Sequence, residues 1–114
     1  MTRYNRGDVI LVPFPSSDQT AAKKRPAIIV SSDTYNSVSQ DIVIMAITGQ
    51  IRGHIGIGEF LIMDWQGAGL LKPSAVKAAI STIEQRLVVR ILGWLSSKDL
   101  STLHKALMEL FDLR

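Results

Sequence analysis

The sequence predicts a mainly β fold with α structure added, in which a curled antiparallel sheet or small barrel is followed by a C-terminal helix. Two observations lead to this fold class. Short runs rich in β-branched residues recur along the chain between turn-forming segments, and only the C-terminal segment repeats its apolar residues at clear helical spacing. The chain has 114 residues and contains no internal repeat or low-complexity segment. We therefore expect a single domain spanning residues 1–114.

The first predicted strand, GDVILVPFP, spans residues 7–15 and ends at two prolines, which cannot donate a hydrogen bond to a neighbouring strand. A polar loop follows over residues 15–24. Loops of this length inside a compact domain are often functional, so this loop is a candidate functional segment. The second predicted strand, RPAIIVS, spans residues 25–31 and has Pro26 at its entry, where a missing N–H costs no ladder hydrogen bond.

The third predicted strand, DIVIMAIT, spans residues 41–48 and is apolar on both faces. We therefore expect it in the interior of the sheet. Residues 32–40, which precede it, contain Asp33 and Asn36 and favour a turn or a short helix. Residues 49–58, which follow it, hold four of the eight glycines and indicate a mobile connection or a tight hairpin.

Further strands are predicted in the second half of the chain. EFLIM, residues 59–63, is a fourth strand, and a glycine-rich connection covers residues 64–73. SAVKAAISTIE, residues 74–84, alternates apolar and other side chains as one or two strands would, although its alanines are also compatible with a helix. RLVVRILGWL, residues 86–95, is the last predicted strand.

The C-terminal helix is the clearest element in the sequence. Ser96 and Asp99 are spaced like a capping box, and Leu95 and Leu100 are placed for a hydrophobic staple. The apolar stripe that follows at helical spacing consists of Leu100, Leu103, Leu107, Leu110 and Phe111. His104 lies beside this stripe and is interpreted as a packing or surface residue, because no second ligand stands at metal-binding spacing from it.

Composition and motif content exclude several kinds of site. The chain has no cysteine, which excludes disulfides and thiolate metal sites, and its carboxylates are scattered. Phosphate-binding Gly-Lys-Ser loops, GxGxxG, HExxH and GxSxG signatures are absent. We therefore predict no metal and no cofactor. The N-terminus lacks a signal-peptide segment and no apolar run is long enough to span a membrane, which predicts a soluble cytoplasmic protein that does not contact membranes.

The net charge of +3 is unevenly distributed along the chain. Residues 1–26 and 72–94 each carry an excess of cations, whereas residues 27–71 carry an excess of acids. Two basic segments that converge in the fold would form a patch for a polyanion such as a nucleic acid. The competing interpretation is an ordinary solvated surface, since most lysines lie on surfaces and maintain solubility.

Two residues at strand ends are candidates for chemistry. Arg25 precedes Pro26, whose fixed φ holds the guanidinium near a rigid framework. A planar fork of donors suits a phosphate better than an ammonium does. Thr48 closes a predicted strand next to Gly49, so its hydroxyl would project into the glycine-rich loop, with Gln50 two residues further on.

Each candidate also has an ordinary structural interpretation. The three consecutive cations at residues 23–25 could serve as gatekeeper charges that prevent edge aggregation. Thr48 could be a β-forming residue whose hydroxyl is satisfied locally. From the residues alone, the functional interpretation rests on the co-occurrence of these features.

Several segments together resemble a known family. RGDVILVPF, KRPAIIVS, AITGQI, LLKPSAVK and STIE occur in the order and spacing found in the MazF/PemK toxin family of bacterial type II toxin–antitoxin systems. The resemblance extends from Arg6 to the terminal helix. It implies a curled sheet of SH3-like, plasmid-maintenance-toxin type with a C-terminal helix, a homodimer, and a cognate antitoxin as partner.

The resemblance also implies an activity, the metal-independent cleavage of single-stranded RNA at short sequences. Arg25 and Thr48 fall on the catalytic arginine and threonine of the family. In such a reaction the 2′-oxygen attacks its own phosphorus, and Arg25 would stabilise the growing charge while Thr48 donates one more hydrogen bond. Because an arginine holds its proton near neutral pH, an acid or base role for Arg25 would require strong local tuning.

RNA-binding roles follow from the same resemblance. The predicted RNA-binding residues are Lys23, Lys24, Gln50, Arg52 and Lys77. The polar loop, residues 16–24, is expected to cover the strand and read bases, while its lysines add salt-dependent affinity.

The chain departs from the family at one place. Many relatives carry acidic and amide side chains where this chain has Ala78 and Ala79, and methyl groups can neither read a base edge nor take a proton. A non-catalytic member that binds nucleic acid or a protein is therefore the alternative function. A poison of a protein target such as a topoisomerase is a third, suggested by fold relatives only. Lys77 could partly compensate by binding phosphate.

Overall fold

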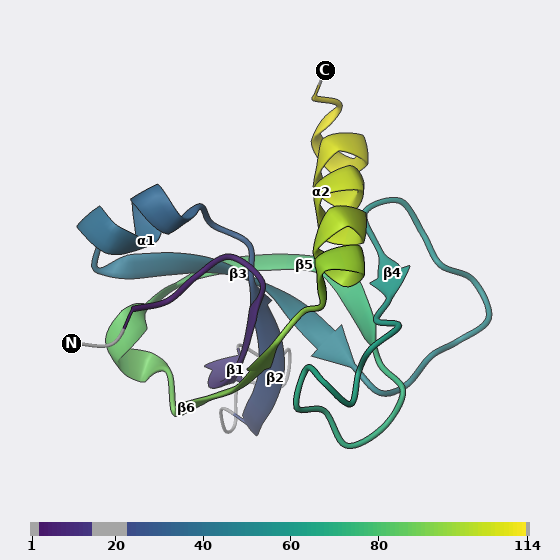
Figure 1. Ribbon diagram of the computed structural model, residues 1–114, viewed down its shortest axis with the longest axis horizontal. Helices are drawn as coiled ribbons and strands as arrows, with labels where there is room; N and C mark the ends of the chain where they lie inside the picture. Colours follow the sequence, from purple (N-terminus) through teal and green to yellow (C-terminus); the bar gives the residue numbers. More distant parts are fainter. Residues whose placement is uncertain (1–2, 15–22, 114) are drawn as a thin grey trace.

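The computed structural model describes residues 3–14 and 23–113 (Figure 1). Its elements, in chain order, are β1 (Asp8–Phe14), β2 (Lys23–Ile29), α1 (Asp33–Val38), β3 (Asp41–Thr48), β4 (Phe60–Leu61), β5 (Ala75–Glu84), a 3₁₀ turn (Gln85–Leu87), β6 (Arg90–Trp94) and α2 (Ser97–Phe111). The short helix predicted around Asp33 and Asn36 is therefore present. Ser32 caps it, because its side-chain oxygen accepts a hydrogen bond from the N–H of Tyr35 at 3.0 Å.

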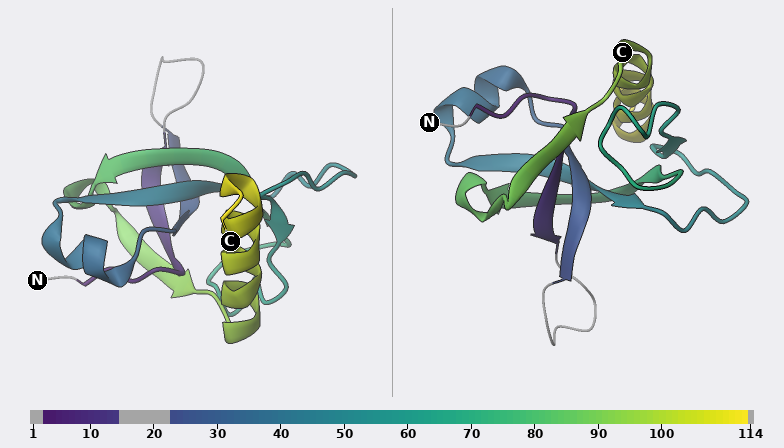
Figure 2. Two further views of the ribbon diagram at one scale, coloured as in Figure 1. Left: turned by 90° about the horizontal axis from the view of Figure 1, so that it is seen from above. Right: turned by 60° about the horizontal axis from the view of Figure 1, so that its bottom comes forward.

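All six strands form one antiparallel sheet in the order β4-β5-β3-β2-β1-β6. The sheet curls strongly, so that β1 and β2 cross beneath β3 and β5 (Figure 2). The curled antiparallel sheet with a C-terminal helix is thus confirmed. β3 lies between β5 and β2, which confirms the interior position predicted from its two apolar faces.

The predicted start of the second strand was wrong. β2 begins at Lys23, so Pro26 lies inside the strand and not at its entry. Pro26 pairs with Leu11 of β1 on one side, whereas on the other side pairing with β3 begins only at Ala27. Proline is tolerated there because no hydrogen bond to β3 depends on its missing N–H. The rest of the predicted polar loop, residues 15–22, lies outside the described residues. The expectation that this loop covers the strand and reads bases concerns those residues and stays a prediction.

Residues 74–84 were predicted to form one or two strands, and a single strand of 10 residues, β5, is found there, so the helical alternative was wrong. Two other strands are shorter than predicted. β4 is limited to two residues because the chain leaves the ladder directly after Ile62. The backbone N–H groups of the next two residues, Met63 and Asp64, point toward Asp99 of α2 instead. β6 begins at Arg90 and not at residue 86, because the 3₁₀ turn occupies the preceding segment.

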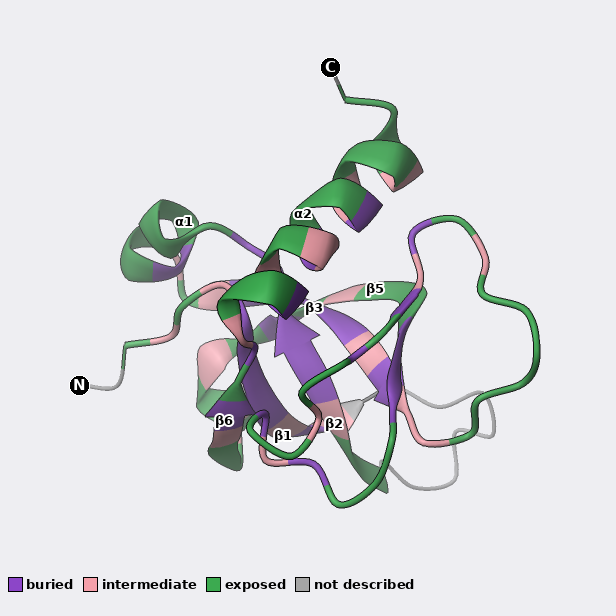
Figure 3. Ribbon diagram, turned by 45° about the vertical axis from the view of Figure 1, so that its right-hand side comes forward, coloured by how far each residue is buried: buried purple, intermediate pink, exposed green. Residues whose placement is uncertain are grey.

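Each face of the sheet carries a buried apolar cluster, because successive side chains of a strand point to opposite faces. One face carries Val9, Ile28 and Met45, which pack with Leu103 and other residues beneath α2 (Figure 3). The opposite face carries a second cluster that the curl of the sheet brings together: Ile10, Val12, Ala27, Ile29, Ile42, Ile44 and Ile83. Each fully buried aliphatic side chain contributes about 1.5–3 kcal/mol, so the two clusters fix the sheet on which any site must rest.

The capping prediction for α2 was half confirmed. The Ser96 hydroxyl accepts a hydrogen bond from the Asp99 N–H at 3.1 Å, as a capping residue does. The Asp99 carboxylate does not return to Ser96. It is fully buried and instead accepts the backbone N–H groups of Met63 and Asp64 at 3.0 and 2.9 Å. His104 is exposed on the helix, in agreement with its interpretation as a surface residue.

The segment around Asp8 joins the N-terminus to the sheet. Gly7 has φ of +94°, and its N–H bonds to the Ile29 carbonyl at 2.8 Å. The Asp8 carboxylate is buried and accepts the Asn5 N–H at 2.9 Å. Burial raises the pKa of Asp8 above its ordinary value of 3.8; nearby Asp33 also raises it, while the Asn5 N–H lowers it.

We expect Asp8→Asn to stabilise the protein relative to wild type by an amount that grows with pH. The raised pKa means that the folded state binds the Asp8 proton more tightly than the unfolded state does. Wild type therefore loses stability as pH rises from about 3.8 through the folded-state pKa, whereas the asparagine keeps an oxygen for Asn5 and does not titrate. Urea unfolding of both proteins across that range measures the difference, and a difference independent of pH would contradict the expectation.

In the described part of the chain, no helix combines the length and apolarity needed to cross a bilayer. Within residues 3–14 and 23–113, no group of three histidine, aspartate or glutamate side chains gathers closely enough to hold a metal ion.

Candidate functional site

A groove of about 710 Å³ lies where the ends of several strands meet. The charged side chains that line it are all cations: Lys23, Lys24, Arg25, Lys72 and Arg90. Thr48 and Gln50 line the same groove from the end of β3 and the loop after it. The fold therefore brings one part of the N-terminal basic segment together with one part of the second basic segment, as a site for a polyanion requires.

Arg25 and Thr48 line this groove from two different strands, β2 and β3. Both lie just beyond the paired part of these strands, which ends at Ala27 and Ala46. On its other side Arg25 pairs with Val12 of β1. The Arg25 side chain is exposed, and its strand continues into Ala27, Ile28 and Ile29, which are fully buried. The exposed guanidinium is thus attached to a strand that is anchored in the core.

The Thr48 hydroxyl is oriented by the backbone of the following turn. Its Oγ1 accepts the Gln50 N–H at 3.1 Å, which leaves the hydroxyl hydrogen free to donate to a ligand. A Cβ at Gly49, between these two residues, would meet the far end of the Lys72 side chain, which shows how closely Lys72 approaches the turn. Lys72 therefore crosses directly over the turn that presents Thr48.

A second hollow of about 470 Å³ adjoins the groove. Thr48 and Gln50 line both, while Arg52 and Lys77 line only the second hollow. The seven residues predicted to bind or cleave RNA are thus divided between two neighbouring hollows that share a wall. Their chemical roles remain predictions.

The second hollow is shaped by an irregularity in β5. Met45 of β3 pairs with Ile80 and Ile47 pairs with Val76, so residues 77–79 of β5 bulge out opposite a single residue of β3. The N–H of Ala78 in this bulge bonds to Glu59 Oε2 at 3.3 Å. The other oxygen of Glu59 accepts the Gly56 N–H at 3.1 Å.

Several residues at the site were not predicted from the sequence. Lys72 and Arg90 belonged to the second basic segment, but neither stood in a recognisable motif. Glu59 and His54, which line the second hollow, had no local signal at all. Glu59 reaches the second hollow because β4, which follows it, pairs with β5, and the spacing of residues along the chain does not reveal this long-range pairing.

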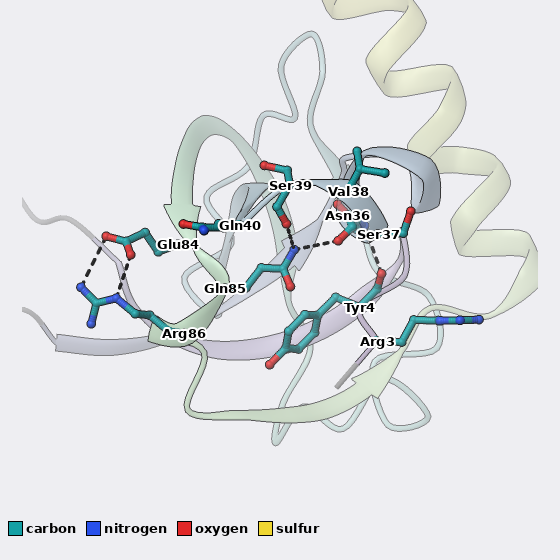
Figure 4. A pocket seen from close by; sticks show the side chains of 10 residues that line it. All are labelled: Arg3, Tyr4, Asn36, Ser37, Val38, Ser39, Gln40, Glu84, Gln85 and Arg86. Carbon is teal, nitrogen blue, oxygen red and sulfur yellow. Dashed lines mark hydrogen bonds and ion pairs between the residues drawn. The ribbon is translucent and has the colours of Figure 1, made fainter. Parts of the chain in front are cut away.

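A third hollow, of about 590 Å³, lies at the opposite end of β3 and β5 (Figure 4). Its polar groups bind one another. Gln85 Nε2 donates to three backbone carbonyl oxygens within residues 36–41 at 2.8 to 3.2 Å, and Arg86 forms an ion pair with Glu84 at 2.7 Å. This hollow therefore holds α1 against β5 and offers no group of free donors like that of the cationic groove.

The cationic groove is suited to phosphate chemistry. A guanidinium can bind two oxygens of one phosphate, and a hydroxyl with a free hydrogen can bind a third. Ammonium groups at Lys23, Lys24 and Lys72 extend the positive surface along a chain of phosphates. The arrangement can therefore bind a nucleic-acid backbone and stabilise negative charge that develops at one phosphorus.

Comparison with known proteins gives one family match. Residues 5–111 match the model of a family described as PemK-like, MazF-like toxin of type II toxin–antitoxin system. No match was found among curated proteins.

Solved structures with the same fold were also found. One is the Mycobacterium tuberculosis toxin MazF-mt6, 23% identical, with a TM-score of 0.75 over 94% of this chain and 98% of that one. MazE-MazF from Deinococcus radiodurans is 17% identical, with a TM-score of 0.77 over 99% and 100%. An endoribonuclease in complex with its cognate antitoxin, from a mycobacterial species, is 19% identical, with a TM-score of 0.75 over 100% and 98%. At these identities the likeness concerns the fold.

Proposed function

The chain belongs to the family of PemK-like, MazF-like toxins of type II toxin–antitoxin systems, and on that premise we propose that it is an endoribonuclease that cuts single-stranded RNA at selected sequences. The observation that carries the proposal is that Arg25 and Thr48 line one groove whose charged lining is wholly cationic. Some fold relatives are themselves described as endoribonucleases.

In the proposed reaction the 2′-hydroxyl of the substrate loses its proton, and the 2′-oxygen attacks the adjacent phosphorus. The bond from phosphorus to the 5′-oxygen breaks, and that oxygen leaves with a proton. Arg25 binds the non-bridging oxygens as their charge grows, and the Thr48 hydroxyl donates a further hydrogen bond. The reaction needs no metal-activated water, because the neighbouring 2′-hydroxyl is the nucleophile.

Binding roles complete the proposal. Lys23 and Lys24 contact phosphates at one end of the groove, and Gln50 lies at the wall between the two hollows. Arg52 and Lys77 hold the RNA in the second hollow. Each phosphate contact releases counterions, so RNA affinity should fall steeply with salt.

The proposed partners follow from the family and from the surface. A cognate antitoxin would occupy the cationic groove with an acidic and apolar segment, in the cytoplasm. A homodimer is also proposed. Its support is a mean hydropathy of +0.19 and the exposure of large apolar side chains on the edge strand β6, where Trp94 is 68% exposed.

One observation favours a second function, that of a non-catalytic member that only binds nucleic acid or a protein. Ala78 and Ala79 lie exposed on the β5 bulge beside the site, where they offer only methyl groups. If a side chain at these positions were needed as the proton acceptor, the groove would still bind RNA without cleaving it.

Incubation of the purified protein with a long single-stranded RNA in excess EDTA tests the proposed activity. We expect discrete cuts whose 5′ fragments end in a cyclic phosphate, because the 2′-oxygen becomes part of the product. Mapping the ends by sequencing gives the sequence preference. Folded, antitoxin-free protein that binds this RNA without cutting it would establish the binding function instead.

A further inference from the structure

Glu59 is the only carboxylate among the residues that line the two adjoining hollows, which otherwise carry cations and neutral groups. Within the described residues Glu59 forms no ion pair, even though its position is opposite Lys77 when the register of β4 and β5 is extended by one residue. A half-buried carboxylate left unpaired among cations is available to a ligand.

The backbone holds this carboxylate in place from two sides. Oε1 accepts the Gly56 N–H and Oε2 accepts the Ala78 N–H, at 3.1 and 3.3 Å. The second bond exists because the β5 bulge removes Ala78 from the ladder with β3 and frees its N–H. An ionised carboxylate has about four acceptor sites, so one site on each oxygen remains open after these two bonds.

We propose that Glu59 reads a guanine base of the RNA next to the cleaved phosphate, an inference that rests on the proposed nuclease function. Two parallel acceptors match two parallel donors, as in carboxylate–arginine pairs. Among the RNA bases, guanine alone presents two adjacent donors, N1–H and N2–H, on its Watson–Crick edge. Single-stranded RNA leaves that edge accessible.

The position of the carboxylate favours reading over catalysis. Arg25 lines the first groove and Glu59 the second, and the two hollows meet at Thr48 and Gln50. A phosphate bound between Arg25 and Thr48 would therefore place a neighbouring nucleotide in the second hollow. Glu59, which directly precedes β4, would thus supply the acceptor that the methyl group of Ala78 cannot provide.

The test compares wild type with Glu59→Gln on a randomised single-stranded RNA whose cut ends are sequenced. We expect wild type to favour guanine at one fixed position beside the cut, and the variant to lose that preference by about tenfold to a hundredfold relative to the other bases. Glu84→Gln is the matched control, since Glu84 is an exposed carboxylate at the end of β5 and lies outside both hollows. The base preference of this variant should equal that of wild type.

A purely structural role for Glu59 would slow cleavage equally at all sites, and that result would overturn the proposal, as would a wild type without guanine preference. A second measurement separates this inference from the nuclease activity. Binding of non-cleavable 2′-deoxy oligonucleotides with and without one guanine should differ by about tenfold for wild type and be equal for Glu59→Gln. Guanine-dependent binding without any RNA cleavage would refute the nuclease function and leave Glu59 as the reader.

Discussion

Arg25→Ala should lower the rate of RNA cleavage by about a hundredfold to a thousandfold, the usual effect of removing one group that stabilises transition-state charge. The guanidinium lines the same groove as Thr48, and its planar fork of donors can bind two oxygens of one phosphate. Single-turnover cleavage of one RNA at its mapped site measures the effect. The fold should persist, because the Arg25 side chain is exposed and makes no hydrogen bond within the described residues.

Two further variants distinguish catalysis from binding. Arg25→Lys keeps the charge but loses the planar fork, so it should retain most of the RNA affinity and still lose most of the rate. Arg3→Ala removes an exposed arginine that lines the hollow at the other end of the sheet and should cleave like wild type. A nearly normal rate for Arg25→Ala, with weakened binding alone, would sink the catalytic role.

The elements that the sequence predicted correctly are those whose signals are local. β3 was recognisable because six successive residues, 42–47, are apolar and so occupy both faces, and α2 because its cap and its apolar stripe lie within one short segment. Arg25 and Thr48 lie on different strands, and that they line one groove is not visible in the spacing of residues along the chain. Only the family resemblance pointed to that pair.

What sequence reasoning missed depends on contacts between distant residues. Glu59 meets Ala78 across 19 positions, through a bulge that no spacing pattern announces. Lys72 reaches Gly49 because the connection before β5 returns to the groove. Such contacts arise from the register of the sheet, and a slip of one residue would send these side chains to the opposite face.

Asp99→Ala should destabilise the protein by about 2–5 kcal/mol, since it removes two hydrogen bonds to a charged group and leaves both donors without that acceptor. The carboxylate is fully buried and binds the N–H groups of Met63 and Asp64, which fixes the connection after β4 to the first turn of α2. The unfolding free energy of a domain is about 5–15 kcal/mol, so the loss is a large fraction of it. Urea unfolding at neutral pH measures it.

The chemistry of the replacement shows whether the hydrogen bonds are responsible. Asp99→Asn keeps one acceptor oxygen but sets an N–H₂ group against the second backbone donor, so it should lose about half as much stability as the alanine variant. Glu109→Ala, which removes an exposed carboxylate from the same helix, should change stability by less than about 0.5 kcal/mol. If Asp99→Ala unfolds at the same urea concentration as Glu109→Ala, the connection after β4 is held by apolar packing and not by the Asp99 carboxylate.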